Sequence, residues 1–289
     1  MTVLLTGTQL GDFVIGEQVN KGGMGAIYRV FKPNSRDPYV AKVLLPAFSA
    51  DEQFRKRFQR EISLLQTLQH PHIIPIVDFG EQDDLLYFVM PYINGQSLAI
   101  LLTRHTFSPG TAWLILEPTM QALAYAHDHH IIHRDLKPDN ILVELKSAHP
   151  FLADFGLSKS IDKSTMTQAG ISIGTPQYMA PEQVRAQAVS PRTDVYALGV
   201  VAYEMLLGRV PFNEGSPDVI AFKHIREAPP PPRSLNPAFP AAVEVVILRA
   251  LAKNPADRFE TATAFSRAYW EALESLTPEA RKQHYWKNS

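Results

Sequence analysis

The chain of 289 residues has a formal net charge of -1 and contains no cysteine. A nearly neutral chain has no electrostatic reason to bind nucleic acid or an anionic membrane surface, so we expect neither as its main partner. The lack of cysteine excludes disulfide bonds, cysteine metal sites and thiol catalysis, and it fits a reducing compartment. With 45% hydrophobic residues, a chain of this length can bury a large core and is long enough for two lobes or domains.

Neither secretion nor membrane insertion is indicated by the apolar stretches. The N-terminal stretch MTVLLTGTQLGDF has no basic flank and no small-residue cleavage site, so we expect no signal peptide. The most apolar later stretch, Val195 to Leu207, contains Glu204 and is shorter than the roughly 20 apolar residues of a membrane span, so we interpret it as a buried core helix. We therefore expect a cytoplasmic location and no membrane contact within this chain, as a free protein or as the cytoplasmic part of a longer membrane-anchored one.

Short apolar segments with turn residues between them predict strands from residue 13 to about residue 90. The segments are DFVIGEQV, AIYRVF, YVAKVLL, PIVDFG and LLYFVM. One helix is predicted among them, from residue 50 to residue 70, because apolar residues recur there at helical spacing. Asp83 and Asp84 lie between the last two segments, where a solvated hairpin turn explains them.

A break at PYINGQ, near residues 91 to 96, separates these strands from a second part with long helical patterns. We predict helices over residues 109–128, 194–207, 240–253 and 261–276. The run APPPPR at residues 228–233 predicts an extended surface loop. The first part of the chain is thus mainly sheet and the second mainly helix.

Two charged residues fall where apolar side chains are expected. Glu61 lies on the apolar stripe of the helix from residue 50 to residue 70, and Lys42 shares a strand face with Val40 and Leu44. A charge that faces a core costs roughly several kcal/mol unless it finds a partner, so the two residues can be expected to pair with each other. The alternative is that one or both side chains extend to water, which is common for lysine.

Four histidines, His127, His129, His130 and His133, lie within seven residues in AHDHHIIH. Their offsets of two and three do not place all four on one face of a helix. His133 also belongs to the polar loop that follows. We therefore do not expect a zinc site here.

The strongest local signal is IIHRDLKPDNILV, residues 131–143. Strand-like flanks enclose a polar loop that carries Asp135, Lys137 and Asn140. Phosphoryl transfer needs a carboxylate to orient the attacking hydroxyl and accept its proton, metal ligands, and cations near the transferred group. These residue types are all present, and FLADFG supplies a second metal-binding carboxylate in Asp154.

In the order and spacing of these motifs, the chain resembles the protein kinase family, and within it the Ser/Thr branch found in eukaryotic-like bacterial kinases. The resemblance extends from about Phe13 to Trp270. It implies an α+β, two-lobed kinase fold, with a small N-terminal antiparallel sheet lobe that carries one main helix and a larger, mostly helical C-terminal lobe. The implied divisions are an N-terminal extension (1–11), an N-lobe (12–92), a C-lobe (93–276) and a C-terminal tail (277–289).

The resemblance also implies roles in catalysis. Lys42 would hold the α- and β-phosphates of ATP, with Glu61 as its partner on the helix. Asp135 would be the catalytic aspartate, and Asn140 and Asp154 would bind Mg2+, or Mn2+ in its place. Lys137 and Thr175 match the pair that frames a Ser or Thr hydroxyl beside the catalytic aspartate.

Three further matches are structural. Ala180, Pro181 and Glu182 match the end of the activation segment, and Arg258 matches the arginine that pairs with that glutamate. Asp194 matches the aspartate that begins the central helix of the large lobe and braces the catalytic loop. The segment ending at Glu182 and its partner Arg258 favour a protein substrate over a small molecule.

The stretch VNKGGMG is compatible with two readings when taken alone, a hairpin turn or a phosphate-binding lid. Read as GxGxxG, it has Asn20 in the first glycine position, Gly22 and Gly25 in the other two, and Gly23 as an extra glycine. The strand and lysine that follow favour the nucleotide lid. Because Asn tolerates a left-handed backbone better than most residues, we expect ATP binding to survive the departure at Asn20.

The resemblance implies an adenine slot as well. Its walls would be formed by Val19, Ile27, Ala41 and Leu142, with Met90 as gatekeeper and a backbone N–H offered by Ile93. Pro91 lacks a backbone N–H, but only its carbonyl should be needed for adenine.

Regulation by phosphorylation is implied by Arg134, which precedes the catalytic aspartate. The expected acceptors are Thr167 as the principal site and Thr165 as the second, in KSTMTQAG. A phosphothreonine there could bind Arg134 and Lys159 through charge-assisted hydrogen bonds.

The implied function is an ATP-dependent Ser/Thr protein kinase that acts on protein substrates, with a kinase homodimer for trans-autophosphorylation. One alternative is a pseudokinase or ATP-binding scaffold without turnover, which the loss of a catalytic or metal-binding residue would have favoured. The other alternative is a small-molecule kinase of similar fold. Such enzymes usually lack equivalents of the segment ending at Glu182 and of Arg258.

Overall fold

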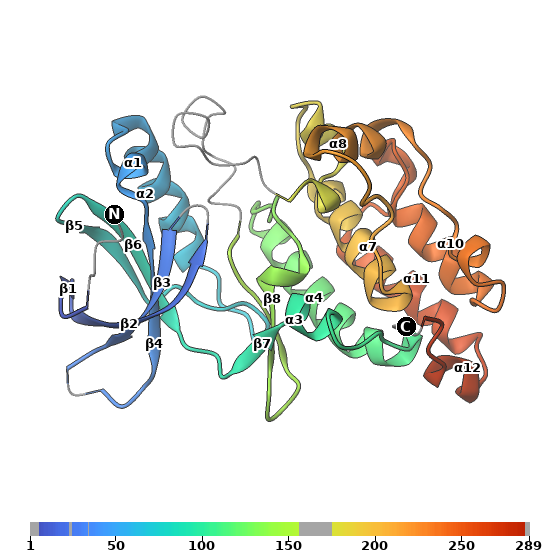
Figure 1. Cartoon of the computed structure of the whole chain (residues 1–289), viewed down its shortest axis with the longest axis horizontal. Coiled ribbons are helices and arrows are strands. Elements are labelled where there is room, and N and C mark those ends of the chain that lie inside the picture. Colours follow the sequence, from blue (N-terminus) through green and yellow to red (C-terminus); the bar gives the residue numbers. More distant parts are fainter. Residues whose placement is uncertain (1–5, 23–24, 34, 156–174, 287–289) are drawn as a thin grey trace. The chain divides into compact units, whose positions relative to one another are not determined.

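The computed structural model describes residues 6–22, 25–33, 35–155 and 175–286. Gly23, Lys159, Thr165 and Thr167 lie outside these described residues. The chain divides into two compact units, each of which is described by itself. Unit 1 contains the described residues up to Asn94, and unit 2 contains residues 95–155 and those from residue 175 onward (Figure 1).

Among the described residues, unit 1 contains a six-stranded antiparallel sheet with the strand order β1-β2-β3-β4-β6-β5. The strands are β1 (Gln9–Leu10), β2 (Phe13–Gly22), β3 (Gly25–Phe31), β4 (Tyr39–Leu44), β5 (Asp78–Gln82) and β6 (Leu85–Pro91). The five expected strands are confirmed, although β5 begins three residues later than PIVDFG suggested. The sequence pattern did not predict β1, because two residues are too few to show an alternation.

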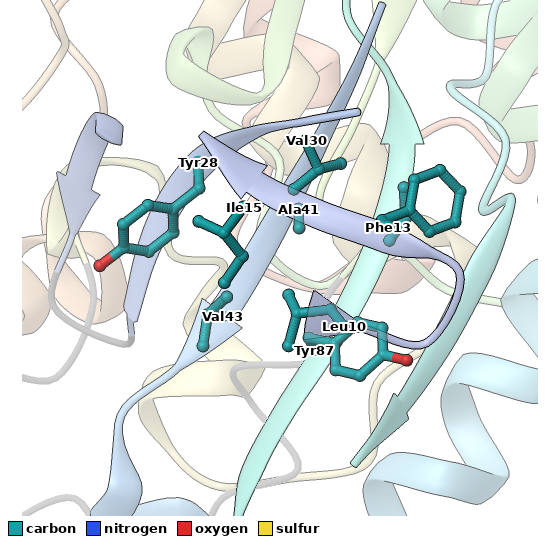
Figure 2. Packing of buried hydrophobic residues seen from close by; sticks show 9 residues of the cluster. Leu10, Phe13, Ile15, Tyr28, Val30, Ala41, Val43 and Tyr87 are labelled. Carbon is teal, nitrogen blue, oxygen red and sulfur yellow. The ribbon is translucent and has the colours of Figure 1, made fainter. Parts of the chain in front are cut away.

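One face of this sheet carries a tightly buried apolar cluster (Figure 2). Side chains alternate between the two faces of a strand, so every second residue of β3 and β4 faces this cluster. Its members are Leu10, Phe13, Ile15, Tyr28, Val30, Ala41, Val43, Tyr87 and Val89. Lys42 lies on the opposite face of β4 together with Val40 and Leu44, which are also buried. The expectation that Lys42 shares an apolar strand face is therefore confirmed.

Two helices, α1 (Pro46–Ser49) and α2 (Glu52–Gln66), connect β4 with β5. The carboxylate of Asp51 caps α2 by accepting hydrogen bonds from the backbone N–H groups of Gln53 and Phe54, at 2.9 and 3.1 Å. The helix buries Phe54, Phe58 and Ile62, a stripe at intervals of four residues. The expected helix is confirmed, with its ends two and four residues inside the expected range of 50 to 70.

The glycine stretch forms part of the hairpin between β2 and β3. Asn20 pairs with Ile27 and Gly22 with Gly25. Asn20 therefore lies in the strand and does not use the left-handed backbone conformation that we considered. At Gly25, a β-carbon would lie 2.1 Å from the carbonyl oxygen of Val43, so close approach of β3 to β4 requires glycine there, whatever the segment binds.

Unit 2 is mainly helical. Its longer helices are α4 (Pro109–Asp128), α7 (Pro191–Leu207), α8 (Pro217–Arg226), α10 (Ala241–Ala250) and α11 (Ala262–Glu274). The shorter helices are α3 (Leu98–Leu102), α6 (Pro181–Val184), α9 (Pro232–Leu235) and α12 (Pro278–Lys282). Single 3-10 turns are η1 (Pro138–Asn140), η3 (Pro176–Tyr178) and η4 (Pro255–Asp257), and β7 (Gly95–Ser97), β8 (Ile141–Glu144) and β9 (Pro150–Leu152) form a three-stranded antiparallel sheet.

Helix α7 is the centre of unit 2. Almost all of its residues are buried, and α4, α10 and α11 pack against it. The four predicted helices are confirmed, but α7 begins at Pro191 rather than at Asp194, because proline suits the first turn of a helix. Across the part of the chain that the structure describes, no helix combines the length and apolar character needed to cross a membrane.

The expected extended loop at residues 228–233 is only partly correct. The Pro230 carbonyl accepts a hydrogen bond from the hydroxyl of Tyr203 at 3.0 Å. Pro232 is buried and begins α9, because its fixed backbone angle suits a helix start. Only residues 228–231 are without regular structure.

Residues 277–286, which we expected to form a tail, pack against the rest of unit 2. Helix α12 contacts α4, and Tyr285 is buried. The Trp286 carbonyl accepts a hydrogen bond from the hydroxyl of Thr106 at 2.8 Å. Gly208, with a φ of 66°, ends α7 next to Trp286, and a β-carbon there would lie 2.6 Å from the indole ring.

Candidate active site

The loop between α4 and η1 carries the residues of the strongest sequence motif. His133 is completely buried, with Nε2 2.9 Å from the carbonyl oxygen of Ala153 and its ring 4.6 Å from that of Phe155. The next residue, Arg134, has a left-handed backbone with a φ of 64°. Such a conformation is unfavourable for a residue with a β-carbon, so its surroundings must hold it in place.

Asp194, in the first turn of α7, holds this loop. Its carboxylate accepts hydrogen bonds from the backbone N–H groups of His133 and Arg134, at 2.8 and 2.9 Å. Burial alone would raise the pKa of Asp194, but the hydrogen bond and charge of His127, together with His133, lower this pKa below its ordinary value. The carboxylate is thus ionised, and the expectation that Asp194 braces the loop is confirmed.

His127 has a part in this arrangement that the sequence reading missed. Its Nε2 lies 2.7 Å from Oδ2 of Asp194, and both side chains are buried. In the sequence, His127 stands out only as a member of a histidine cluster. Two other members of the cluster have partners of their own: His129 contacts the Tyr125 carbonyl at 2.8 Å, and His133 contacts the Ala153 carbonyl. No spacing in the sequence indicates a partner 67 residues away.

Asp135, Lys137 and Asn140 come together as expected. Lys137 Nζ lies 3.2 Å from Asp135 Oδ2. The amide nitrogen of Asn140 donates to the Asp135 carbonyl at 2.7 Å and contacts its carboxylate at 3.3 Å. The side chains of Asp135 and Lys137 are about one fifth exposed, so a hydroxyl group from solvent or from another molecule can reach the carboxylate.

Asp154 lies at the same end of the β8–β9 hairpin as Asn140. In this hairpin Ile141 is paired with Leu152, and the backbone N–H of Ala153 donates to the Asn140 carbonyl at 2.9 Å. Because the amide nitrogen of Asn140 points to the Asp135 loop, its amide oxygen is the atom with which it would bind a cation. An amide oxygen and a carboxylate are ligands that Mg2+ and Mn2+ prefer, so this donor set fits a divalent cation.

The residues that follow residue 174 connect with this loop. Thr175 precedes η3, and the side-chain amide of Gln183 donates to the Arg134 carbonyl at 2.8 Å. The hydroxyl of Tyr178 donates to Glu204 on α7 at 2.6 Å. Burial raises the pKa of Tyr178 and, despite this hydrogen bond, that of Glu204.

Glu182 and Arg258 form the expected pair. Two nearly parallel hydrogen bonds of 2.8 Å join the guanidinium to the carboxylate, and Thr193 donates a third to the carboxylate at 2.8 Å. Glu182 is 3% exposed and Arg258 1%. Burial acts to raise the pKa of Glu182, but the hydrogen bonds and charge of Arg258 lower it below its ordinary value.

The residues expected to bind the nucleotide are divided between the two units. Unit 1 contains Val19, Asn20 and Gly22 on β2, Gly25 and Ile27 on β3, Ala41 and Lys42 on β4, Glu61 on α2, Met90 and Pro91 on β6, and Ile93 after it. Leu142 lies on β8 of unit 2. Lys42 Nζ is 5.9 Å from the centre of the Phe88 ring. The pairing of Lys42 with Glu61 and the adenine slot stay predictions.

Comparison with known proteins gives a family match over nearly the whole chain. Residues 13–270 match the family described as "Protein kinase domain". The chain is 40% identical to the serine/threonine-protein kinase pkn3 of Myxococcus xanthus over 275 residues, which are 91% of this chain and 50% of that protein. It is 36% identical to the serine/threonine-protein kinase PknB of Mycobacterium tuberculosis over 287 residues, 96% of this chain and 46% of that protein. The chain thus spans about half the length of these curated relatives.

Solved structures give the same result for the fold. The chain is similar to the PknI kinase domain of Mycobacterium tuberculosis, with a TM-score of 0.77 and 30% identity over 93% of this chain and 99% of that one. An antiparallel sheet unit with one main helix and a mostly helical unit are the two parts that the resemblance implied. The expected α+β, two-lobed fold is confirmed.

Proposed function

This chain belongs to the protein kinase family, and we propose that it is an ATP-dependent kinase of serine and threonine residues in protein substrates. The proposal rests chiefly on the Asp135 carboxylate, which lies within 3.3 Å of both Lys137 and Asn140. Asp194 holds the loop that carries it. The relatives named as Ser/Thr kinases support the substrate class.

In the proposed reaction, Asp135 orients the substrate hydroxyl and accepts its proton as the oxygen attacks the γ-phosphorus of ATP. The bond from the γ-phosphorus to the bridging oxygen breaks, and ADP leaves. Lys137 places a positive charge beside the reacting oxygen, which stabilises the charge that develops there. Thr175 frames the same hydroxyl.

Nucleotide and metal binding complete the proposal. Protein kinases in general use ATP and a divalent metal, and we assign Mg2+ to Asn140 and Asp154, where it would neutralise negative charge on the phosphates. Lys42, positioned by Glu61, holds the α- and β-phosphates. For a longer membrane-anchored protein of which this chain is the kinase part, we propose that the kinase part lies on the cytoplasmic side of the membrane. We also propose that one copy of the protein phosphorylates another.

The type of residue phosphorylated is the first test. After incubation with Mg-ATP and a peptide library, mass spectrometry should find phosphoserine and phosphothreonine almost exclusively. A sample with Asp135→Asn serves as the control for contaminating kinases. Predominant phosphotyrosine would contradict the substrate class, and phosphorylation no greater than in the Asp135→Asn sample would favour the pseudokinase alternative.

Phosphorylation of Thr167, and secondarily of Thr165, is proposed to activate the enzyme. The side-chain Nε of Arg134 is buried and has no hydrogen-bond partner among the described residues. A phosphothreonine adds about -1.5 to -2 charges and could bind this guanidinium and Lys159. Contacts of this kind would hold the phosphorylated segment in one arrangement and so increase the rate of phosphate transfer.

We expect the Thr165→Ala/Thr167→Ala variant and Arg134→Ala to start at a rate at least about fivefold below that of the phosphorylated wild type. Phosphatase treatment should bring the wild type down to the same rate. Ser164→Ala, in the same segment, is the matched control and should keep the activation. If the double variant and the dephosphorylated enzyme both start at the full rate, activation by phosphorylation of this segment is refuted.

A further inference from the structure

Three polar residues from different parts of unit 2 form a hydrogen-bonded group, and α8, which carries one of them, packs against η3. His224 on α8 is completely buried, and its Nδ1 lies 2.8 Å from the hydroxyl oxygen of Tyr196 on α7. Lys253, which follows α10, has its Nζ 3.4 Å from the same hydroxyl oxygen and 4.6 Å from the centre of the Phe212 ring. The proposed phosphate transfer uses none of them.

The direction of these hydrogen bonds follows from chemistry. Burial, and then the charge of Lys253, lower the pKa of His224 to about 3, so its imidazole is neutral. A lysine ammonium group can only donate hydrogen bonds, so the hydroxyl oxygen of Tyr196 accepts from Lys253, and we assign its hydroxyl hydrogen to Nδ1 of His224. A neutral imidazole that accepts at Nδ1 carries its proton on Nε2. The three residues therefore form a directed chain of hydrogen bonds that ends at the Nε2–H of His224.

The surroundings of Lys253 act, on the whole, against its positive charge. Burial and the charges of Arg258 and Arg185 act against the positive charge of Lys253, whereas Glu227 favours it, and the net effect is to lower its pKa to about 8. Lys253 is therefore protonated in most molecules at neutral pH. Burial also raises the pKa of Tyr196, so its hydroxyl keeps the proton that it donates to His224.

The far end of this chain is Nε2 of His224 on α8. Nε2 of His224 is buried and forms no hydrogen bond of ordinary geometry with a described residue. The side-chain Oε1 of Gln177, in η3, is likewise buried without a hydrogen-bond partner among the described residues. Helix α8 also packs against η3 as a whole. Gln177 is two residues from Thr175, which we expect to frame the substrate hydroxyl.

We propose that Lys253, Tyr196 and His224 are positioning residues, which hold η3 and therefore Thr175 in the orientation that binds a protein substrate. This inference rests on the proposed function and deepens it. The hydrogen bonds among Lys253, Tyr196 and His224 fix α8 relative to α7, and η3 packs against α8, so they restrict the orientation of η3. Loss of one member leaves the others unsatisfied, so the effect should be transmitted to η3.

The test uses Tyr196→Phe, which removes only the hydroxyl oxygen of the central residue. We expect the KM for a peptide substrate to rise at least about fivefold, while the KM for ATP changes less than about twofold. Tyr203→Phe is the matched control, because Tyr203 lies on the same helix and its hydroxyl is also hydrogen-bonded, to the Pro230 carbonyl at 3.0 Å. This control should keep both KM values.

Substitutions of His224 separate positioning from simple packing. His224→Gln keeps a side-chain acceptor for the hydroxyl of Tyr196 and should retain a peptide KM close to that of the wild type, whereas His224→Leu, of similar size but apolar, should not. Equal peptide KM values for the Leu variant and the wild type would overturn the proposal. A rise in the peptide KM of Tyr203→Phe as large as that of Tyr196→Phe would overturn it as well.

A second measurement does not depend on turnover. Hydrogen exchange followed by mass spectrometry should show faster exchange at residues 176–180 in Tyr196→Phe and in His224→Leu, but not in Tyr203→Phe. Unchanged exchange at these residues contradicts the positioning role even if the wild type transfers no phosphate. If the wild type transfers no phosphate, in contrast, the proposed function is contradicted. The hydrogen-exchange result then still tests whether these residues position η3.

Discussion

Replacing Asp135 with asparagine should lower kcat by about 10²- to 10⁴-fold, which corresponds to roughly 3–5 kcal/mol of transition-state stabilisation. Asparagine has nearly the same shape but cannot accept the hydroxyl proton. It also removes the negative charge that lies 3.2 Å from Lys137 Nζ. The measurement is the steady-state kcat with saturating peptide and Mg-ATP, together with the melting temperature, which should remain within a few degrees of the wild-type value.

Asp128→Asn is the matched control for this change. Asp128 is the exposed last residue of α4, so the substitution alters the net charge equally but leaves the loop intact. We expect its kcat to equal that of the wild type. Near-normal transfer by Asp135→Asn would refute the assignment of Asp135, and an equal loss in both variants would show that net charge, and not the carboxylate, matters.

The local part of this site could be predicted from the sequence because its geometry is local. Asp135, Lys137 and Asn140 lie within one loop and one 3-10 turn, so their spacing already brings them together. The strands and long helices were predictable for the same reason, since their periodicity lies within a single segment. Element ends were less predictable, as at Pro191, where the helix begins before the apolar pattern does.

The contacts that hold the loop could not be deduced from spacing. His127 and Asp194 are 67 residues apart, and Glu182 and Arg258 are 76 residues apart. The family resemblance implied the second pair and the role of Asp194, but neither it nor the pattern indicated His127. Such contacts depend on how helices pack in three dimensions, which the period of one helix does not encode.

Replacing Arg258 with methionine should lower the free energy of unfolding by about 3–5 kcal/mol, because it leaves the Glu182 carboxylate buried without its counter-charge. For a unit of this size we expect a melting temperature about 6 to 20 °C below that of the wild type. The loss should depend on pH. The wild-type pKa of Glu182 lies below the ordinary value of 4.5, so the stability that the pair contributes is present above pH 4.5 and is lost as the pH falls through that lower value.

The melting temperatures of the wild type and Arg258→Met should therefore differ most at neutral pH and approach each other in acid, where protonation also removes the isolated charge from the variant. Glu182→Leu/Arg258→Met should recover part of the lost stability, because it leaves no unpaired charge. Glu260→Gln is the control: Glu260 is exposed and lies 3.9 Å from Arg192, and the loss of this pair should change the melting temperature by less than about 2 °C. A double variant no more stable than Arg258→Met would show that the destabilisation comes from lost packing and carbonyl contacts of Arg258, and not from an isolated charge.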